Sequence, residues 1–313
     1  MNYKKILKNQ DLRFKILNLL SWIPDKTMVK IQYRIKLGRK LDLKNPKRFT
    51  EKLQWYKLYY RKPIMHQCVD KYEVRKYVES KGLKSILNEL YGVYDNPEDI
   101  DFEKLPKKFV IKTTSGTGGQ NVLLCDNKDK LDIKETVDKL KHWLKLNPKK
   151  SFGREWAYEG TKNKIIIEKL LEGNDDNLSG VNDYKFFCYN GKAKYIVLDG
   201  DRFVEHKRNF YDRDWNYIDI QTDCGQLGDV IKKPKGLNEM LKVAEQLSTE
   251  FPYVRVDLYC IKNKVYFGEM TFYPWTGYVQ YYPDEFDFEL GKDFVTNKAS
   301  IERNSKTVKK DRK

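Results

Sequence analysis

Three charged residues lie inside two apolar segments near the C-terminal end of the sequence: Arg255, Asp257 and Glu269. Apolar and polar residues alternate along the stretch 253–271, and this alternation predicts two antiparallel strands joined by a tight turn. A charged side chain inside such a strand is costly to bury unless it is paired with an opposite charge or bound to a metal. These residues are therefore the first candidates for chemistry.

The register of this hairpin decides whether the charged side chains meet. We expect a three-residue turn at 262–264, which places Asp257 opposite Glu269 and Arg255 opposite Thr271, whereas a two-residue turn would separate them. The same register places four residues of the second strand on one face: Val265, Phe267, Glu269 and Thr271. Two facing carboxylates form an oxygen site suited to Mg²⁺, and an internal salt bridge between Arg255 and the two acids is the alternative. The hairpin alone leaves both interpretations open.

A glycine-rich segment between two predicted strands is the second candidate site. The strand 108–112 runs into five small residues, and the strand 121–125 leads out of them. Glycine lets the backbone approach a ligand closely, and successive N–H groups with small hydroxyls can cradle phosphate oxygens. Lys112, at the end of the first strand, is placed to pair with a phosphate, although a plain hairpin with a flexible tip fits the same residues. The loop residues are Ser115, Gly116, Thr117, Gly118 and Gly119.

Two further lysines stand in predicted elements. Lys71 falls in the first turn of a helix predicted over 70–80, where the helix dipole disfavours a cation unless it reaches toward a bound anion. A solvated surface lysine is the alternative at this position. Lys185 lies on the first strand of a hairpin predicted over 183–199, which contains an Asn-Gly turn.

A short apolar strand predicted over 164–171 contains Glu168 and leads into a linker. The backbone N–H and C=O groups of such a linker can meet the edge of an adenine ring.

The elements that position these residues indicate an α+β fold. Amphipathic helices dominate residues 1–62, which we expect to form a basic helical N-terminal segment. Residues 63–294 form the main domain, with a strand–loop–strand unit, a helix and a mostly antiparallel β region. Residues 295–313 are a basic tail that we expect to be disordered.

The net charge of +16 is unevenly distributed over the 313 residues. Residues 1–62 hold 18 Lys and Arg against 4 Asp and Glu, whereas residues 63–302 carry a net charge of −3. A folded nucleic-acid-binding domain would carry the basic face itself, so no nucleic-acid partner is expected. The basic segment indicates contact with an anionic glycan or a membrane surface, and a helix packed on the main domain with a solvated outer face is the alternative.

The remaining composition indicates a cytoplasmic protein. The five cysteines are scattered without a CxxC pair, which fits reduced thiols. The three histidines are too dispersed for a zinc site. The apolar run at 16–23 is too short to span a bilayer.

Taken together, six motifs in order resemble the ATP-grasp superfamily, and most closely its TupA-like branch, which is associated with bacterial cell-surface polysaccharide biosynthesis. The motifs are DKYEVRKYV, FVIKTTSGTGG, IIIEKLL, DYKFF, VRVDLY and YFGEMTFYP, within a similarity that spans roughly residues 34–291. The resemblance implies two α+β subdomains that grip ATP. It departs from the family pattern at Thr271, where Asn is common, and at Thr114, where the close branch has His.

The resemblance also implies roles for the candidate residues. Lys71 and Lys112 contact the phosphates, the loop 115–119 closes over them, and the linker with Glu168, Lys169 and Leu171 holds adenine. Asp257, Glu269 and Thr271 bind Mg²⁺, while Arg255 and Lys185 steady the transferring phosphoryl group.

The implied activity is an ATP-dependent carboxylate–amine ligation through an acyl phosphate, with ADP and phosphate as products. The acceptor expected is an anionic glycan or a lipid-linked sugar of a surface or capsular polysaccharide, and the donor is an amino acid or amine. A phosphotransferase and a glycosyltransferase-like enzyme of the same biosynthesis are the enzymatic alternatives. A non-enzymatic polyanion-binding protein is the remaining one.

Overall fold

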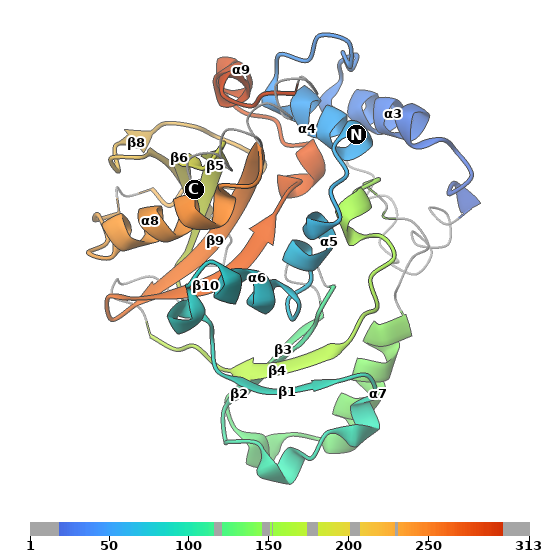
Figure 1. The fold of residues 1–313 in the computed structure, drawn as a ribbon, viewed down its shortest axis with the longest axis vertical. Coiled ribbons are helices and arrows are strands. Elements are labelled where there is room, and N and C mark those ends of the chain that lie inside the picture. Colours follow the sequence, from blue (N-terminus) through green and yellow to red (C-terminus); the bar gives the residue numbers. More distant parts are fainter. Residues whose placement is uncertain are drawn as a thin grey trace.

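The computed structural model describes residues 19–115, 121–145, 151, 153–173, 181–200, 207–228 and 231–296. Two antiparallel sheets face each other across a group of short helices (Figure 1). This arrangement confirms the predicted α+β class. The predicted tail at 295–313 lies outside the described residues from position 297 onward, as does the start of the N-terminal segment at 1–18.

The small sheet has four strands in the order β1-β4-β2-β3: β1 (Leu90–Tyr94), β4 (Ile165–Lys169), β2 (Phe109–Thr113) and β3 (Val122–Cys125). Helix α7 (Ile133–Lys145) packs on one face of it, where Leu140 and Trp143 join the buried aliphatic residues of β2 and β4. Because alternate strand residues are taken up by this core, the polar residues of β2 and β4 project toward the large sheet.

The large sheet has six strands in the order β10-β9-β5-β6-β7-β8, all antiparallel. The strands are β5 (Asp183–Tyr189), β6 (Lys192–Gly200), β7 (Lys207–Asp212), β8 (Tyr217–Ile218), β9 (Tyr253–Ile261) and β10 (Lys264–Thr271). The β5–β6 hairpin turns at Asn190 and Gly191, whose φ angles of 48° and 79° are those of the predicted Asn-Gly turn.

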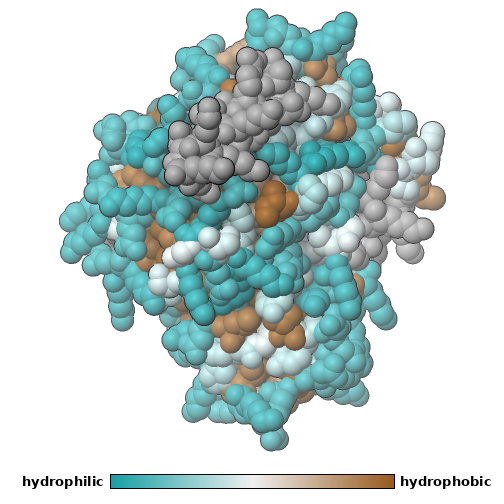
Figure 2. Space-filling view, viewed as in Figure 1, coloured by the Kyte–Doolittle hydropathy of each residue, from teal (hydrophilic) through white to brown (hydrophobic). Residues whose placement is uncertain are grey.

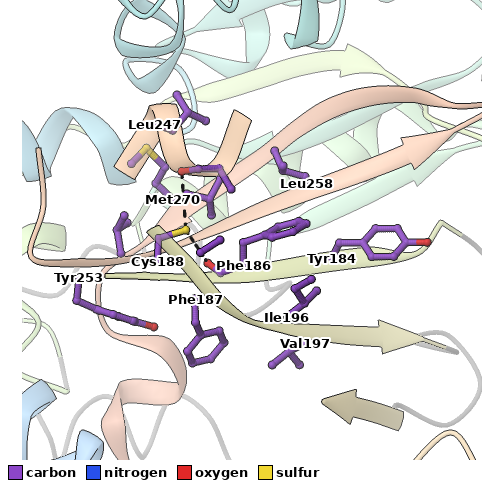
Figure 3. Packing of buried hydrophobic residues seen from close by; sticks show 14 of the residues in the cluster. Tyr184, Phe186, Phe187, Cys188, Ile196, Val197, Leu247, Tyr253, Leu258 and Met270 are labelled. Carbon is purple, nitrogen blue, oxygen red and sulfur yellow. Dashed lines mark hydrogen bonds between the residues drawn. The ribbon is translucent and has the colours of Figure 1, made fainter. Parts of the chain in front are cut away.

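The two faces of the large sheet have different environments. Helix α8 (Leu237–Ser248) covers one face, and the Cys188 thiol lies 3.8 Å from the Ala244 carbonyl oxygen of this helix. Figure 3 shows Phe186 and Phe187 projecting from β5 to opposite sides. The odd-numbered residues of β5 and β9, Lys185 and Asp257 among them, therefore lie on the face away from α8.

Among the described residues, five further α-helices lie between the sheets or at the top of the molecule in Figure 1. They are α3 (Asp25–Leu37), α4 (Phe49–Tyr59), α5 (Ile64–Val69), α6 (Val74–Ser80) and α9 (Glu285–Lys292). Of these, α5 and α6 lie between the sheets, and α3, α4 and α9 lie at the top (Figure 1). The helices α3 and α4 lie within the described part of the segment 1–62, which stays a predicted unit. Phe49, Leu53 and Tyr56 of α4 belong to the core of the large sheet, and the boundary proposed at residue 62 remains a prediction.

The surface in Figure 2 is dominated by hydrophilic residues, with apolar atoms in small areas between them. Among the described residues, no helix has both the length and the apolar character that crossing a membrane requires.

The register of β9 and β10 brings together the predicted pairs, although the predicted turn is wrong. Ile261 pairs with Lys264 across a two-residue turn, whose residues Lys262 and Asn263 have φ angles of 50° and 62°. A β-bulge between Phe267 and Glu269 then adds one residue to β10. The bulge compensates for the shorter turn, so Asp257 lies opposite Glu269 and Arg255 lies opposite Thr271.

Because of this bulge, the prediction that four residues of β10 share one face is wrong. Val265 and Phe267 lie opposite Cys260 and Leu258, whereas Glu269 and Thr271 lie opposite Asp257 and Arg255. The four residues of β10 therefore do not share one face, because the extra residue switches the alternation. The extra residue is Gly268, where a Cβ would lie 2.8 Å from the Asp257 carbonyl oxygen and 3.2 Å from Cε2 of Tyr259.

Candidate functional site

The charged side chains of β9 and β10 form one hydrogen-bonded group. The Arg255 guanidinium donates from Nε and NH2 to the two carboxylate oxygens of Asp257, both at 2.7 Å. The same NH2 donates to Glu269 Oε1 at 3.3 Å and to Thr271 Oγ1 at 3.2 Å. This bidentate pairing is the internal salt bridge that the sequence left open as the alternative to a metal site.

Lys185 extends this group across β5. Its ammonium lies 2.6 Å from Asp183 Oδ2 and 2.8 Å from Asp257 Oδ2, because Lys185 is the direct partner of Asp257 in the β5–β9 ladder. On the next strand, Asp199 accepts a hydrogen bond of 2.8 Å from Nε of Arg208. Cations and carboxylates therefore alternate across the strands of the large sheet.

The electrostatics of this group favour its charged forms. Burial alone would disfavour the Lys185 ammonium, but the carboxylates of Asp183 and Asp257 raise its pKa above the ordinary value. Burial likewise opposes the Asp257 carboxylate, yet Arg255 and Lys185 together lower its pKa. Asp257 therefore remains ionised in a buried position.

Whether these carboxylates can ligate a metal ion, as predicted from the sequence, depends on how exposed their oxygens are. The side chain of Glu269 is 38% exposed, and that of Asp257 is 2% exposed. Among the described residues, no hydrogen bond reaches Glu269 Oε2, whereas both oxygens of Asp257 accept from cations. No group of three or more His, Cys, Asp or Glu suited to a metal occurs in the described part of the chain. A metal held here would therefore need phosphate oxygens or water among its ligands.

The small sheet contributes a second group of paired charges. Lys112 donates to Glu168 Oε2 at 2.8 Å, and Arg75 of α6 donates to Glu168 Oε1 at 3.0 Å. Arg75 also donates to the Asn88 carbonyl oxygen at 2.8 Å. The Lys112 side chain is 26% exposed, so it can exchange Glu168 for a bound anion.

Lys71 lies between the two sheets. Its N–H donates to the Thr114 carbonyl oxygen at 3.0 Å, directly after β2. Helix α6 begins only at Val74, so Lys71 precedes it and does not lie in its first turn; Asp70 instead accepts the N–H groups of Tyr72 and Glu73.

The surroundings of Lys71 come from both sheets. Burial lowers the pKa of Lys71, the Glu269 carboxylate of the large sheet raises it, and the Lys112 ammonium of the small sheet lowers it further. The pKa of Lys71 is therefore affected by charges on both β2 and β10. This proximity brings together Lys71, Lys112 and Glu269, which are far apart in the sequence.

The glycine-rich loop is described only at its start. The N–H of Ser115 donates to Asn163 Oδ1 at 3.2 Å, and Thr114 exchanges hydrogen bonds with the backbone of Lys164. Gly116, Thr117, Gly118 and Gly119 lie outside the described residues.

At the end of β4, before the linker, some backbone groups already form hydrogen bonds within the protein. The N–H of Lys169 donates to the Glu89 carbonyl oxygen at 3.0 Å, and its own carbonyl oxygen accepts from Asn88 Nδ2 at 2.8 Å. A carbonyl oxygen has two lone pairs, so this one can accept a second hydrogen bond. Leu171 follows the end of the strand and is half-buried.

A strained turn borders the charged group of the large sheet. Trp275 and Thr276, in the segment Pro274–Gly277, both have left-handed φ angles of 49° and 59°. The Trp275 ring lies 4.2 Å from the Arg208 guanidinium and 5.6 Å from that of Arg255. The turn therefore holds the Trp275 ring close to both guanidinium groups.

Two side chains of α4 support this turn. The Lys57 ammonium donates to the Thr276 carbonyl oxygen at 2.7 Å, and Gln54 Nε2 donates to the Gly277 carbonyl oxygen at 3.0 Å. Burial lowers the pKa of Lys57 to about 8, although the nearby Glu155 carboxylate raises it. This role could not be predicted from the residue pattern, because Lys57 lies in a helix whose apolar residues indicate only packing against the main domain.

Comparisons with known proteins bear on this site. A sequence model of the family described as TupA-like ATPgrasp matches residues 51–295. No curated protein sequence matches the chain.

Among solved structures, the chain is similar to a D-alanine–D-alanine ligase from Bacillus anthracis, with 20% identity over 65% of this chain and 56% of that chain and a TM-score of 0.40. It is also similar to an L-amino acid ligase from Bacillus licheniformis, with 15% identity over 66% of this chain and 43% of that chain and a TM-score of 0.40. The chain thus spans about half the length of these two proteins.

Proposed function

Because this chain belongs to the TupA-like ATP-grasp family, we propose that it is an ATP-dependent ligase that joins an amine to a carboxylate. The observation that carries the proposal is a charged group on each sheet with Lys71 beside them. Lys112 pairs with Glu168 on the small sheet and Arg255 with the exposed Glu269 on the large sheet. The N–H of Lys71 donates to the Thr114 carbonyl oxygen after β2, and the Glu269 carboxylate of β10 raises the pKa of Lys71 against the effect of burial. A nucleotide triphosphate needs cations for its phosphates and a carboxylate for its Mg²⁺, and Lys71, Lys112 and Glu269 offer both.

In this proposal the small sheet holds the nucleotide. Lys112 leaves Glu168 to pair with a phosphate, and Lys71 contributes a second positive charge. Ser115, the described start of the glycine-rich loop, would lie beside the phosphates, and the segment after Glu168 would present the Lys169 carbonyl oxygen and the Leu171 N–H to the adenine edge. Glu168, freed of Lys112, keeps its hydrogen bond from Arg75.

The proposed reaction has two steps. An oxygen of the acceptor carboxylate attacks the γ-phosphorus of ATP, the bond from that phosphorus to the β–γ bridging oxygen breaks, and ADP leaves. The nitrogen of the amine then attacks the carbonyl carbon of the acyl phosphate, and the carbon–oxygen bond to phosphate breaks. The nitrogen loses one proton to the departing inorganic phosphate, and the amide is formed. The protein contributes positioning and charge neutralisation in both steps.

Arg255 and Lys185 have different places in this mechanism. We assign Arg255 to the transferring phosphoryl group, since no hydrogen bond of its NH1 group occurs among the described residues. Lys185 lies opposite Asp257 on the neighbouring strand β5, and its side chain is only 4% exposed. It fixes Asp257, and through Asp257 it fixes the guanidinium of Arg255.

We further propose that Mg²⁺ is held by Glu269 and Thr271, with Asp257 as the third protein ligand. Glu269 fits this role best because its carboxylate is the most exposed of the site. Asp257 can ligate the ion only where a hydrogen bond from Arg255 is given up. The ion would neutralise negative charge on the phosphates.

The acceptor that we propose is a carboxylate on a bacterial surface or capsular polysaccharide or its lipid-linked precursor, and the donor is an amino acid or amine. The half-buried Trp275 ring beside Arg208 and Arg255 supports this choice. An aromatic face can stack on a sugar ring, and guanidinium groups pair with carboxylates. We place the reaction in the cytoplasm, where ATP is available.

Calorimetric titration of ATP with and without Mg²⁺ tests the nucleotide site. We expect binding that depends on Mg²⁺ and that falls about ten-fold or more in Lys112→Ala and in Glu269→Gln, since each removes a charge-assisted contact. Lys108→Ala is the matched control, because Lys108 lies directly before β2 and pairs with Glu172 at an exposed position. Absence of binding at millimolar ATP, alone or with acceptor, would refute the proposal.

The products distinguish the ligase from the alternatives. A ligase releases ADP and inorganic phosphate in equal amounts and forms an amide. A phosphotransferase releases ADP without phosphate and leaves the phosphoryl group on the glycan. A glycosyltransferase consumes no ATP.

A further inference from the structure

Helix α3 presents a mixed basic and apolar surface to the outside. Lys26, Lys30 and Arg34 form one exposed row with a spacing of four residues, and Ile31 and Ile35 form a second row beside it. The two isoleucines are 43% and 52% exposed. A solvated helix face would carry polar residues in both rows.

Large exposed apolar side chains concentrate around this helix. Just before it, Leu19 is 73% exposed and Trp22 is 78% exposed. Of the nine large hydrophobic side chains that are exposed among the described residues, four lie within positions 19–35. We call the surface formed by Leu19, Trp22, Lys26, Lys30, Ile31, Arg34 and Ile35 the α3 surface.

The opposite face of α3 fixes it to the protein. Val29 and Tyr33 are fully buried, and the Tyr33 hydroxyl lies 2.9 Å from Thr50 Oγ1 of α4. Gln32 accepts a hydrogen bond of 2.8 Å from the Tyr278 hydroxyl, one residue after the Trp275 turn. The α3 surface is therefore held in place, at the end of the molecule away from the small sheet (Figure 1).

We propose that the α3 surface docks the protein on a bilayer that contains anionic lipids. Lysines and arginines near such a bilayer are attracted to its negative surface, while Trp and branched aliphatic side chains enter the boundary between headgroups and acyl chains. A hollow of about 350 Å³ is lined by Lys30, Arg34, Lys40 and Leu41, and it is placed to take a lipid phosphate.

The charge distribution orients the whole protein in the same way. Residues 1–62 carry 18 Lys and Arg against 4 Asp and Glu, whereas residues 63–302 have a net charge of −3. An anionic bilayer therefore attracts the segment 1–62, which contains the α3 surface, but not residues 63–302. A nucleic acid would use the basic row but not the exposed aliphatic side chains and Trp22.

Sedimentation of the full chain with vesicles tests this proposal. The probes are vesicles of phosphatidylcholine alone and of phosphatidylcholine with phosphatidylglycerol. We expect binding only to the anionic vesicles, with a loss on the order of 100-fold in Lys26→Ala/Lys30→Ala/Arg34→Ala, because each cation near the surface contributes roughly five-fold. Trp22→Ala should lose about ten-fold, since one large apolar side chain is removed from the interface.

The matched control is a double variant on α7, Ile133→Ser/Lys134→Ala, which removes one exposed apolar and one exposed basic side chain from another helix. It should bind vesicles like the unchanged protein. Each variant is checked for its thermal unfolding midpoint and for ATP binding, which should not change. Equal binding to both vesicle types, equal losses in the control, or binding of RNA in place of vesicles would overturn the proposal.

Discussion

Replacement of Lys57 should change how the stability of the protein depends on pH. The Lys57 ammonium is fully buried, and burial lowers its pKa to about 8. In the unfolded chain a lysine keeps its proton up to about pH 10.4. Between these values the unfolded state binds more protons than the folded state, so the free energy of unfolding rises with pH.

The size of this effect follows from the two pKa values. Between pH 7 and 9.5, the deprotonation of Lys57 in the folded state should add about 2 kcal/mol to the stability of the unchanged protein relative to Lys57→Met. Chemical denaturation at several pH values measures this difference. The buried tyrosines affect both proteins alike, so their titration cancels.

Lys44→Met serves as the control, because Lys44 is exposed. The free energy of unfolding of this variant should change with pH in parallel with that of the unchanged protein. A difference between the unchanged protein and Lys57→Met that stays flat or falls from pH 7 to 9.5 would refute the reasoning. It would mean that Glu155 keeps Lys57 charged throughout, and that the Trp275 turn rests on a buried ion pair.

Two further variants test the β9–β10 hairpin and its support. Gly268→Val should abolish Mg²⁺-dependent ATP binding in calorimetry, because a Cβ 2.8 Å from the Asp257 carbonyl oxygen is incompatible with the bulge that positions Glu269; unchanged binding would contradict this. Lys185→Met should destabilise the protein by about 3–5 kcal/mol in urea denaturation, because Asp183 and Asp257 lose a shared buried cation; a cost below about 1 kcal/mol would show that these carboxylates are protonated or solvated instead.

The fold could be predicted where local residue types determine the conformation. The Asn-Gly turn of the β5–β6 hairpin follows directly from the left-handed φ angles that this pair tolerates. The helix over Leu237–Ser248 follows from an apolar stripe at helical spacing. The family match then confirms the ATP-grasp resemblance drawn from six motifs.

The β9–β10 hairpin shows where sequence reasoning reaches its limit. Its charged pairs were predicted correctly with an incorrect turn, because a three-residue turn without a bulge and a two-residue turn with a bulge pair Asp257 with Glu269 alike. Only the side of Val265 and Phe267 differs between the two arrangements. A glycine inside a strand pattern is the signal for the bulge, and Gly268 carried it.

Other parts of the site depend on contacts between distant segments. Lys57 and Thr276 are 219 positions apart, and nothing in either segment indicates that they meet. Arg75 reaches Glu168 across 93 positions. Such contacts are set by the packing of α4 and α6 against the sheets, which a residue pattern does not encode.

The exposure of each charge separates the groups that ligands can exchange from those that hold the scaffold. Lys112 and Glu269, with side chains 26% and 38% exposed, form contacts that water already weakens. Under the function that we propose, a phosphate and Mg²⁺ would replace these contacts at little cost. Lys185 and Asp257, with side chains 4% and 2% exposed, form a buried pair that would leave a charge unpaired if it broke. Asp257 can therefore reach Mg²⁺ in our proposal only by giving up a hydrogen bond from Arg255 while it keeps Lys185.

The buried pairs therefore hold Arg255 in position, while the exposed side chains of Lys112 and Glu269 are the ones that can change partners. Under the function that we propose, this division is what would let a site whose charges already pair with one another accept a highly charged nucleotide.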